Sequence, residues 1–351
     1  MKRKVITALL AATMVASLAV GCGNKGGDSK SDSSKSSSSD EITIGFSQVG
    51  AESDWRTANS ESMKSTFSEK NGYKLIFDDA QQKQENQITA IRNFIQQDVD
   101  YIVLAPVTET GWDTVLKEAK DADIPVIIVD RMIDVSDDSL YTAWVGSNFK
   151  MEGQKACEWL NAYAEAKGMK EVNIAHIQGT IGASAQIGRT EGLEEAAKEY
   201  GWNIVAQQTG EFTQAKGQEV MESMLKQHDN INVVYCENDN EAFGAIDAIE
   251  AAGKTVGPDG DILVMSFDTT NAGLTDTLSG KITLDTECNP LHGPRVQEII
   301  EKLEAGEEVD KQAYVDEEMF AADDTVTSIK VDDADYEVTT ITQDIIDGRA
   351  Y

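Results

Sequence analysis

Tyr101-Ile102-Val103-Leu104-Ala105 is a continuous apolar run rich in β-branched residues, and Pro125-Val126-Ile127-Ile128-Val129 is a second one. Strands with apolar residues on both faces are typical of a parallel sheet covered by helices on either side. Between such runs, segments like Gln84–Gln97 carry isoleucines at helical spacing and polar residues on the opposite face. The sequence therefore predicts an α/β fold with parallel sheets. The strand candidates are Ile42–Phe46, Tyr101–Ala105, Pro125–Val129, Val172–Ile177, Asn232–Tyr235 and Ile262–Phe267.

The chain contains the same order of features twice, namely a strand with a polar loop and then two further strand ends. The first copy comprises Phe46–Ser53, Ile102–Pro106 and Val129–Arg131, and the second comprises Ile177–Ser184, Val234–Asp239 and Phe267–Thr269. The spacing is similar, with 58 positions from Ser47 to Ala105 and 59 from Gln178 to Glu237. Ligands of open α/β sheets bind beyond the carboxyl ends of the strands. Two such lobes would therefore place these ends on the two walls of one cleft.

The N-terminus has the pattern of an export signal. Met1-Lys2-Arg3-Lys4 is basic, and Val5–Val20 is apolar but shorter than the roughly 20 residues that a membrane span needs. We expect residues 1–21 to be a signal peptide. Ala19-Val20-Gly21-Cys22 resembles the lipobox of bacterial lipoproteins, which implies lipidation of Cys22 and anchoring to the cell membrane on its outer side. The alternative is an ordinary secretory signal that is cleaved nearby.

Residues 22–40 consist almost entirely of Ser, Gly, Lys, Asp and Asn, so we expect a disordered linker. The remaining chain of about 310 residues is long enough for two domains. The net charge is −32, and it becomes −35 once residues 1–21, with three basic groups and no acid, are removed. Such an acidic chain will not bind nucleic acid through its phosphates.

Cysteine and histidine usage gives no sign of a metal site or of a disulfide framework. Besides Cys22, the chain has three cysteines, Cys157, Cys236 and Cys288, so at least one of their thiols stays unpaired. Whether two of them pair is left open. The three histidines are scattered, without a His-x-x-His or Cys-x-x-Cys motif. We expect neither a metal nor a cofactor.

A series of motifs lies within residues 41–315, namely Gly45–Arg56, Gln81–Gln87, Ala105–Val107, Thr110–Trp112, Ile128–Arg131, Gln178–Ser184 with Arg189, Glu237–Asp239 and Ser266–Asp268. Together these motifs resemble the sugar-binding proteins of ABC importers, in the subgroup of ribose- and galactofuranose-binding proteins. The resemblance implies the type I periplasmic-binding-protein fold, which has two Rossmann-like lobes joined by a hinge. It implies a first lobe of residues 41–146 with about 289–318, and a second of 147–288. Residues 319–351 do not match the family closely, so their placement is left open, with the second lobe as one option. We expect crossovers near Trp144–Ser147 and Glu287–Pro290.

The resemblance also implies a set of sugar-binding residues. On the first lobe they are Glu52, Ser53, Trp55, Arg56, Gln82, Asp130 and Arg131; on the second they are Arg189, Asn238 and Asp268, with Glu287 on the hinge side. Carboxylates accept hydrogen bonds from sugar hydroxyls, guanidinium groups donate to them, and an indole face packs against ring C–H groups. Taken singly, Asp130-Arg131 could be a strand-end ion pair, Trp55 a core residue and Arg189 a solvated helix residue.

The loops also bear on the type of sugar. Gly50–Arg56 contains one aromatic residue, Trp55, and the facing loop Gly179–Ser184 contains none. Because stacking a six-membered ring between two aromatics would need a second one, this pattern favours a five-membered sugar with a hydroxylated tail. The galactofuranose-like motifs favour the same ligand. We expect galactose, through its furanose form, and arabinofuranose-like sugars to bind ahead of ribose and glucose.

Three classes of function compete. A solute-binding lipoprotein would deliver a monosaccharide to an ABC transporter permease, and we expect it to be monomeric and not an enzyme. An exported glycan hydrolase would need an activated nucleophile or a carboxylate of raised pKa, whereas here arginines match the site carboxylates. A transcriptional regulator would need a basic helix-turn-helix before residue 41, where the chain has a signal and a Ser-rich segment. Sugar sensing through a membrane receptor would use the same pocket and stays open.

Overall fold

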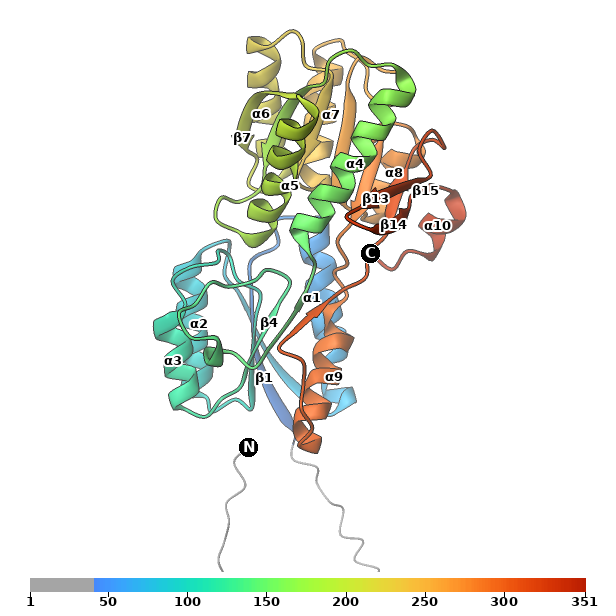
Figure 1. Ribbon diagram of the computed structural model, residues 1–351. Helices are drawn as coiled ribbons and strands as arrows, with labels where there is room; N and C mark the ends of the chain where they lie inside the picture. The colour runs from blue at the N-terminus through green and yellow to red at the C-terminus, as the bar shows by residue number, and fades with distance from the viewer. Residues whose placement is uncertain (1–40) are drawn as a thin grey trace, which may run out of the picture. The chain divides into compact units, whose positions relative to one another are not determined.

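Two sheets form the centre of the folded chain, which the computed structural model describes over residues 41–351 (Figure 1). The first sheet has the order β11-β5-β4-β3-β1-β2, and all of its strands are parallel. Its strands are β1 Ile42–Gln48, β2 Tyr73–Asp79, β3 Tyr101–Leu104, β4 Val126–Val129, β5 Ala143–Gly146 and β11 Gln312–Tyr314. The expected signal peptide, linker and lipidated Cys22 lie outside the described residues.

The second sheet has the order β15-β12-β10-β9-β8-β6-β7, with β12 antiparallel to β10 and the other pairs parallel. Its strands are β6 Asn173–Gln178, β7 Asn203–Thr209, β8 Val233–Cys236, β9 Leu263–Asp268, β10 Leu284–Glu287, β12 Met319–Ala321 and β15 Thr339–Thr340. The orders β2-β1-β3-β4-β5 and β7-β6-β8-β9-β10 are equivalent. The predicted α/β fold with two lobes of like topology is therefore confirmed. Strands β3, β4, β5 and β8 are buried at every residue, because helices cover both faces of each sheet.

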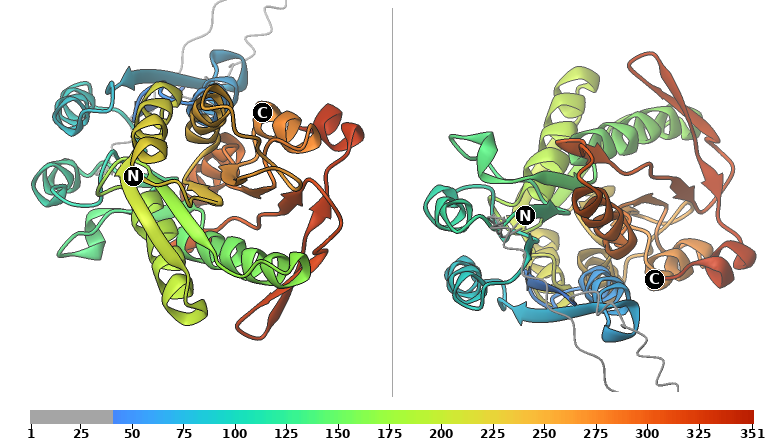
Figure 2. Two further views of the ribbon diagram at one scale, coloured as in Figure 1. Left: turned by 90° about the horizontal axis from the view of Figure 1, so that it is seen from above. Right: turned by 90° about the horizontal axis from the view of Figure 1, so that it is seen from below.

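Helices lie on both faces of each sheet (Figures 1 and 2). In the first lobe, the helix α1 packs on α9, and α2 packs on α3. In the second lobe, α4 packs on α5, and α6 on α7. Their bounds are α1 Asp54–Thr66, α2 Gln84–Gln96, α3 Asp113–Asp121, α4 Phe149–Lys167, α5 Ser184–Tyr200, α6 Gln214–Gln227, α7 Asp239–Ala251 and α9 His292–Ala305.

The chain passes between the lobes three times, at residues 147–148, 288–291 and 315–318. After the third crossover, it adds β12 to the second sheet and forms a hairpin of β13 Ser328–Val331 and β14 Ala334–Glu337, which packs on α4. The last helix, α10 Gln343–Gly348, packs on α8 Asn271–Leu278. The C-terminal segment therefore lies entirely against the second lobe.

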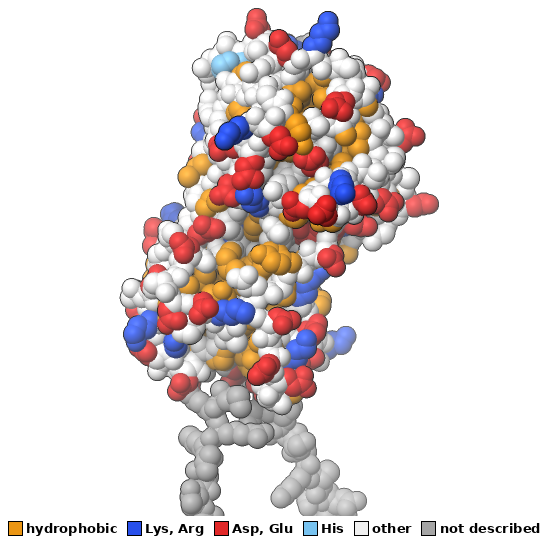
Figure 3. All heavy atoms as spheres, in the orientation of Figure 1, with side chains coloured by type: hydrophobic (Ala, Val, Ile, Leu, Met, Phe, Trp, Pro, Cys, Tyr) orange, Lys and Arg blue, Asp and Glu red, His pale blue; other side chains and the backbone are white. Residues whose placement is uncertain are grey.

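Acidic side chains are spread over both lobes on the face shown in Figure 3, interspersed with fewer basic ones. Cys157, Cys236 and Cys288 are all buried free thiols. Within residues 41–351, no helix is long and apolar enough to cross a bilayer.

Candidate functional site

A cavity lies between the carboxyl ends of the two sheets, with about 290 Å³ of unfilled space when its part open to solvent is included. Nine of the eleven residues that the sequence suggested for the site line it: Glu52, Ser53, Trp55, Arg56, Asp130, Arg131, Arg189, Asn238 and Asp268. The other lining residues are Phe149, Ala185, Phe212 and Cys288. The residues come from both lobes and from the second crossover.

On the first wall, the beginning of α1 presents Arg56 to Asp130. Ser53 caps the helix by accepting a hydrogen bond from the Arg56 backbone N–H at 3.1 Å. The Arg56 guanidinium lies 2.8 Å from Asp130 Oδ2 through Nη1 and 3.1 Å from Glu52 Oε1 through Nε. Burial opposes the charge of Arg56, but Asp130 and Glu52 outweigh it and raise its pKa. The guanidinium is therefore fixed and positively charged.

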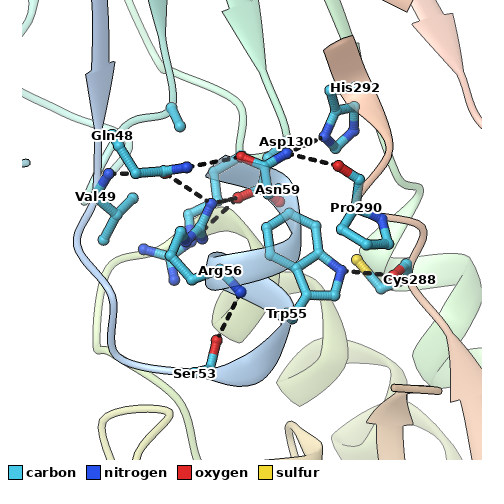
Figure 4. A network of polar contacts seen from close by, with 12 residues as sticks. Gln48, Val49, Ser53, Trp55, Arg56, Asn59, Asp130, Cys288, Pro290 and His292 are labelled. Carbon is cyan, nitrogen blue, oxygen red and sulfur yellow. Dashed lines mark hydrogen bonds and ion pairs between the residues drawn. The ribbon is translucent and has the colours of Figure 1, made fainter. Parts of the chain in front are cut away.

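A buried polar network connects Arg56 to the second crossover (Figure 4). The Gln48 amide accepts from Arg56 Nη1 at 3.2 Å and donates to Asn59 Oδ1 at 2.8 Å. Asn59 Nδ2 then donates to the Pro290 carbonyl at 2.8 Å. Beside this network, the Trp55 indole donates to the Cys288 carbonyl at 2.6 Å. Two consecutive residues of the cavity wall are thus held against the hinge.

Arg131 follows Asp130 after the end of β4, and its side chain contacts the second lobe at Phe212. Its Nη1 donates to the Val107 carbonyl at 3.1 Å, and its guanidinium lies 5.0 Å from the centre of the Phe212 ring. Burial, together with the nearby Arg56 charge, lowers the pKa of Arg131 to about 10, so the group is still charged at neutral pH.

Arg189 of α5 is the cation of the second wall, and its side chain is buried. Its Nε donates to Glu152 Oε2 at 2.7 Å, and its Nη1 donates to the Glu237 carbonyl. Its Nη2 lies 3.6 Å from Asp268 Oδ1 and has no hydrogen-bond partner within residues 41–351. A buried donor of this kind needs an acceptor, since leaving it unpaired costs about 1–3 kcal/mol.

Asn238 and Asp268 complete the second wall. Asn238 caps α7 by accepting from the Glu241 N–H at 2.9 Å, and its Nδ2 donates to the Phe212 carbonyl at 3.3 Å. Asp268 differs from the expectation that every site carboxylate is ionised. Burial raises its pKa well above the usual range, and Arg189 only partly opposes this effect.

The two lobes contact each other around the cavity. The Met132 N–H donates to Ser184 Oγ at 2.8 Å, and the Glu109 N–H donates to the Gly182 carbonyl at 2.9 Å. In a third contact between the lobes, the Asp54 N–H donates to Asn240 Oδ1 at 3.1 Å. These contacts enclose the cavity, and Trp55 is only 3% exposed.

Phe149 and Phe212 are aromatic residues of the cavity that sequence reasoning missed, so the expectation of one aromatic residue in the site was wrong. The internal repeat could have indicated Phe212, because its position corresponds to that of Gln82 in the first lobe. The loop after β7 corresponds to the loop after β2, and Glu211 and Phe212 have positive φ just as Gln81 and Gln82 do. Phe149 opens α4 directly after the first crossover, where the sequence pattern shows only a helix beginning.

Gln82 and Glu287, which the sequence also suggested, do not line the cavity. Gln82 lies in the loop after β2, where its N–H donates to the Val49 carbonyl at 2.7 Å. Glu287 ends β10 and is held by the C-terminal segment. Arg349 Nη1 and the Tyr351 hydroxyl donate to its Oε1 at 2.8 and 2.5 Å.

Comparison with known proteins agrees with this arrangement. Residues 44–286 match the family described as periplasmic binding protein domain. The chain is 47% identical over 252 residues to the galactofuranose-binding protein YtfQ of Escherichia coli (strain K12), covering 71% of this chain and 76% of that protein.

Two solved structures of similar proteins contain furanose sugars. A Mycobacterium smegmatis protein in complex with β-D-fucofuranose is 44% identical, with a TM-score of 0.77 over 81% of this chain and 92% of that one. The binding-protein component of the arabinose ABC transporter from Shewanella sp. ANA-3, bound to α- and β-L-arabinofuranose, is 43% identical, with a TM-score of 0.75 over 81% of this chain and 93% of that one. The chain therefore belongs to the periplasmic binding protein family, among the sugar-binding components of ABC importers.

Proposed function

We propose that this protein captures a monosaccharide in its furanose form by closure of the two lobes and delivers it to an ABC transporter permease. The observation that carries this proposal is the pairing of Arg56 with Asp130 on one wall and Arg189 with Asp268 on the other, around one enclosed cavity. Charged side chains at the ends of equivalent strands offer both donors and acceptors to a ligand with several hydroxyls.

Two buried polar atoms of the cavity support a polar ligand in particular. Within residues 41–351, neither Arg189 Nη2 nor Asp130 Oδ2 has a hydrogen-bond partner, although Asp130 Oδ2 is in the ion pair with Arg56. Buried polar groups in native proteins are nearly always satisfied. Sugar hydroxyls would supply an acceptor for Arg189 and a donor for Asp130. Trp55, Phe149 and Phe212 would pack against the ring C–H groups.

Preference for a furanose rests on the relatives rather than on the number of aromatic residues. YtfQ is named for galactofuranose, and the two similar structures hold fucofuranose and arabinofuranose. The motifs of this chain that resemble the galactofuranose-binding subgroup favour the same class. Binding without chemistry is proposed, as the family is one of binding proteins.

The conformational change would be hinge closure of the two lobes about the three crossovers. We assign residues 41–146 with 289–318 to one moving body and 147–288 with 319–351 to the other. Export and a lipid on Cys22 would keep the protein at the outer side of the cell membrane, beside the permease. Deletion of the gene should then abolish uptake of radiolabelled sugar by intact cells. Normal uptake with a lost transcriptional response to the sugar would indicate a sensor instead.

Thermal unfolding with a panel of sugars tests the ligand class. A ligand at 100 times its dissociation constant adds about 2.7 kcal/mol of stability, which is easily measured. D-Galactose and L-arabinose should stabilise the protein more than ribose and glucose. Methyl β-D-galactopyranoside, which cannot form the five-membered ring, should give no shift. Equal shifts with this glycoside and with free galactose would contradict the furanose assignment, and no shift with any sugar would contradict sugar binding.

A further inference from the structure

One carboxyl group connects all three crossovers. Glu317 lies in the third crossover, and its Oε1 accepts hydrogen bonds from Ser147 Oγ of the first at 2.5 Å and from the Asn289 N–H of the second at 2.8 Å. Ser147 Oγ also lies 3.3 Å from Cys288 Sγ, so the thiol donates to the hydroxyl. Because these three segments connect the lobes, a rotation of one lobe relative to the other acts on the segments that meet at the Glu317 carboxyl group.

A second carboxyl group joins this point to the cavity. Glu152, on the first turn of α4, accepts from Arg189 Nε through its Oε2. Its other oxygen, Oε1, is buried and accepts no hydrogen bond from an N–H or a hydroxyl group within residues 41–351. Ligand atoms of Glu152, Cys288 and Glu317 all lie within 4.8 Å of one another. The carboxyl groups of Glu152 and Glu317 are in side-chain hydrogen-bond contact with each other.

The surrounding charges place one proton between these carboxyl groups. Burial raises the pKa of Glu152, but Arg189, from α5, binds it directly and favours its ionised form over that of Glu317. No cation contacts the Glu317 carboxyl group within residues 41–351. The nearby Lys155 of α4 donates instead to the Glu317 backbone carbonyl, at 3.3 Å. Asp268 of β9 and the buried Cys288 thiol add no positive charge. Burial and the Glu152 charge raise the pKa of Glu317 well above its usual range.

We propose that Glu317 is a protonated acid that donates to Glu152, and that the two act as a positioning pair for Arg189 in sugar binding. Glu317, in the third crossover, then accepts from the first and second crossovers through one oxygen and donates to Glu152 through the other. Glu152 in turn holds the guanidinium toward the cavity. This inference rests on the proposed function. A metal ion at the same three ligand atoms is less favourable, since the Arg189 charge would lie beside it.

The consequence is that closure on sugar takes up a proton. When the lobes open and water reaches the pair, the pKa of Glu317 falls toward that of a solvated glutamate. In the closed form it keeps its proton to higher pH. At pH values between the pKa of Glu317 in the open form and its pKa in the closed form, the affinity for sugar should fall as pH rises, by up to about tenfold per pH unit for one proton. A purely structural contact would not give this slope.

Calorimetric titration with D-galactose between pH 6 and 9 tests the proposal. The dissociation constant of the wild type should rise with pH, and heats in buffers of different ionisation enthalpy should show proton uptake. Glu317→Gln keeps a donor to Glu152 at every pH, so its affinity should not change with pH and should equal or exceed that of the wild type at pH 6. Glu318→Gln, an exposed neighbour with the same chemical change, should behave as the wild type does. Glu152→Gln should weaken binding at every pH because Arg189 loses its carboxylate.

Parallel pH curves for the wild type and Glu317→Gln, or a flat curve for the wild type, would overturn the shared proton. Failure of the wild type to bind any sugar would overturn the proposed function instead. That outcome would also overturn the role of the pair in sugar binding, because this role rests on the proposed function.

Discussion

Asp130 directly follows β4 and Asp268 ends the equivalent strand β9, and both have left-handed backbone, with φ of 63° and 110°. Non-glycine residues adopt positive φ at a cost, which is smallest for Asn and Asp. Such strain persists where the surrounding structure enforces it, and it is concentrated at functional sites. Here it places the two carboxyl groups opposite Arg56 and Arg189.

Replacing Asp130 or Asp268 by Asn should separate binding from backbone strain. Asn tolerates positive φ, so the unfolding midpoint should change little. Asp130→Asn loses the ion pair with Arg56 in the cavity, so its affinity should fall at least about thirtyfold, or about 2 kcal/mol. Asp130→Ala should lose about 1 kcal/mol of stability in addition. Asp332, exposed with φ of 52°, is the control: Asp332→Ala should lose stability without losing affinity.

Arg189→Lys should fail although it keeps the positive charge. A single ammonium group cannot reach Glu152, the Glu237 carbonyl and the ligand together, whereas the guanidinium fork can. We expect at least a thirtyfold loss of affinity, measured by calorimetry. Arg92→Lys, at an exposed pair with Glu118, should bind normally. Normal binding by Arg189→Lys or Arg189→Ala would mean that the second wall is misplaced.

Trp55→Phe tests the contact between the cavity wall and the second crossover. Phenylalanine keeps an aromatic face but removes the hydrogen bond to the Cys288 carbonyl. Loss of a buried hydrogen bond costs about 1 kcal/mol, so affinity should fall about fivefold. Trp202→Phe, which lies against Tyr200 away from the cavity, is the matched control. An unchanged dissociation constant for Trp55→Phe would show that this bond does not contribute to closure.

A second buried acid pair predicts how stability depends on pH. Burial raises the pKa of Asp239 to about 6 and raises that of its neighbour Asp285 well above the usual range. Because both values are raised in the folded protein, their contribution is full below the unfolded value, about 3.9, and is lost as pH rises through 6 and beyond. Asp285→Asn keeps a donor to Asp239, so its loss of stability above pH 6 should be smaller. Asp259→Asn, at an exposed site, should follow the wild type in denaturant unfolding.

Cys22→Ala tests the lipid anchor. Radiolabelled palmitate should enter the wild type but not the variant, and the variant should appear in the medium. Stable anchoring needs more than one acyl chain, so the wild type should resist a salt wash of the membranes. Equal labelling of both proteins would contradict lipidation at this residue.

The sequence predicted those parts of the molecule that repeat and that follow strand periodicity. The apolar runs located β3 and β4, and the polar residues after them proved to be the strand ends that form the walls, as with Asp130. Arg189 was placed through its family motif rather than by periodicity. The burial of Glu152 was invisible, because its helix shows no break in pattern and its partner Glu317 is far away in the chain.

The segment after residue 318 had no counterpart in the repeat, and its strands are only two to four residues long. Local pattern carries little information at that length. Glu287 shows the effect on the site: its carboxyl group is occupied by Arg349 and Tyr351, which are 62 and 64 positions away in the chain. Only the tertiary contact decides that this acid serves the hinge region instead of the cavity.

The three crossovers also have a consequence for the entropy of binding. Two bodies joined by one flexible strand can adopt many relative orientations, and a ligand that bridges them must restrict all of these. Three short connections, at 147–148, 288–291 and 315–318, restrict the free protein to a narrow set of rotations before any sugar arrives. Little orientational freedom is then left to lose on closure, so more of the interaction free energy of a small ligand appears as affinity.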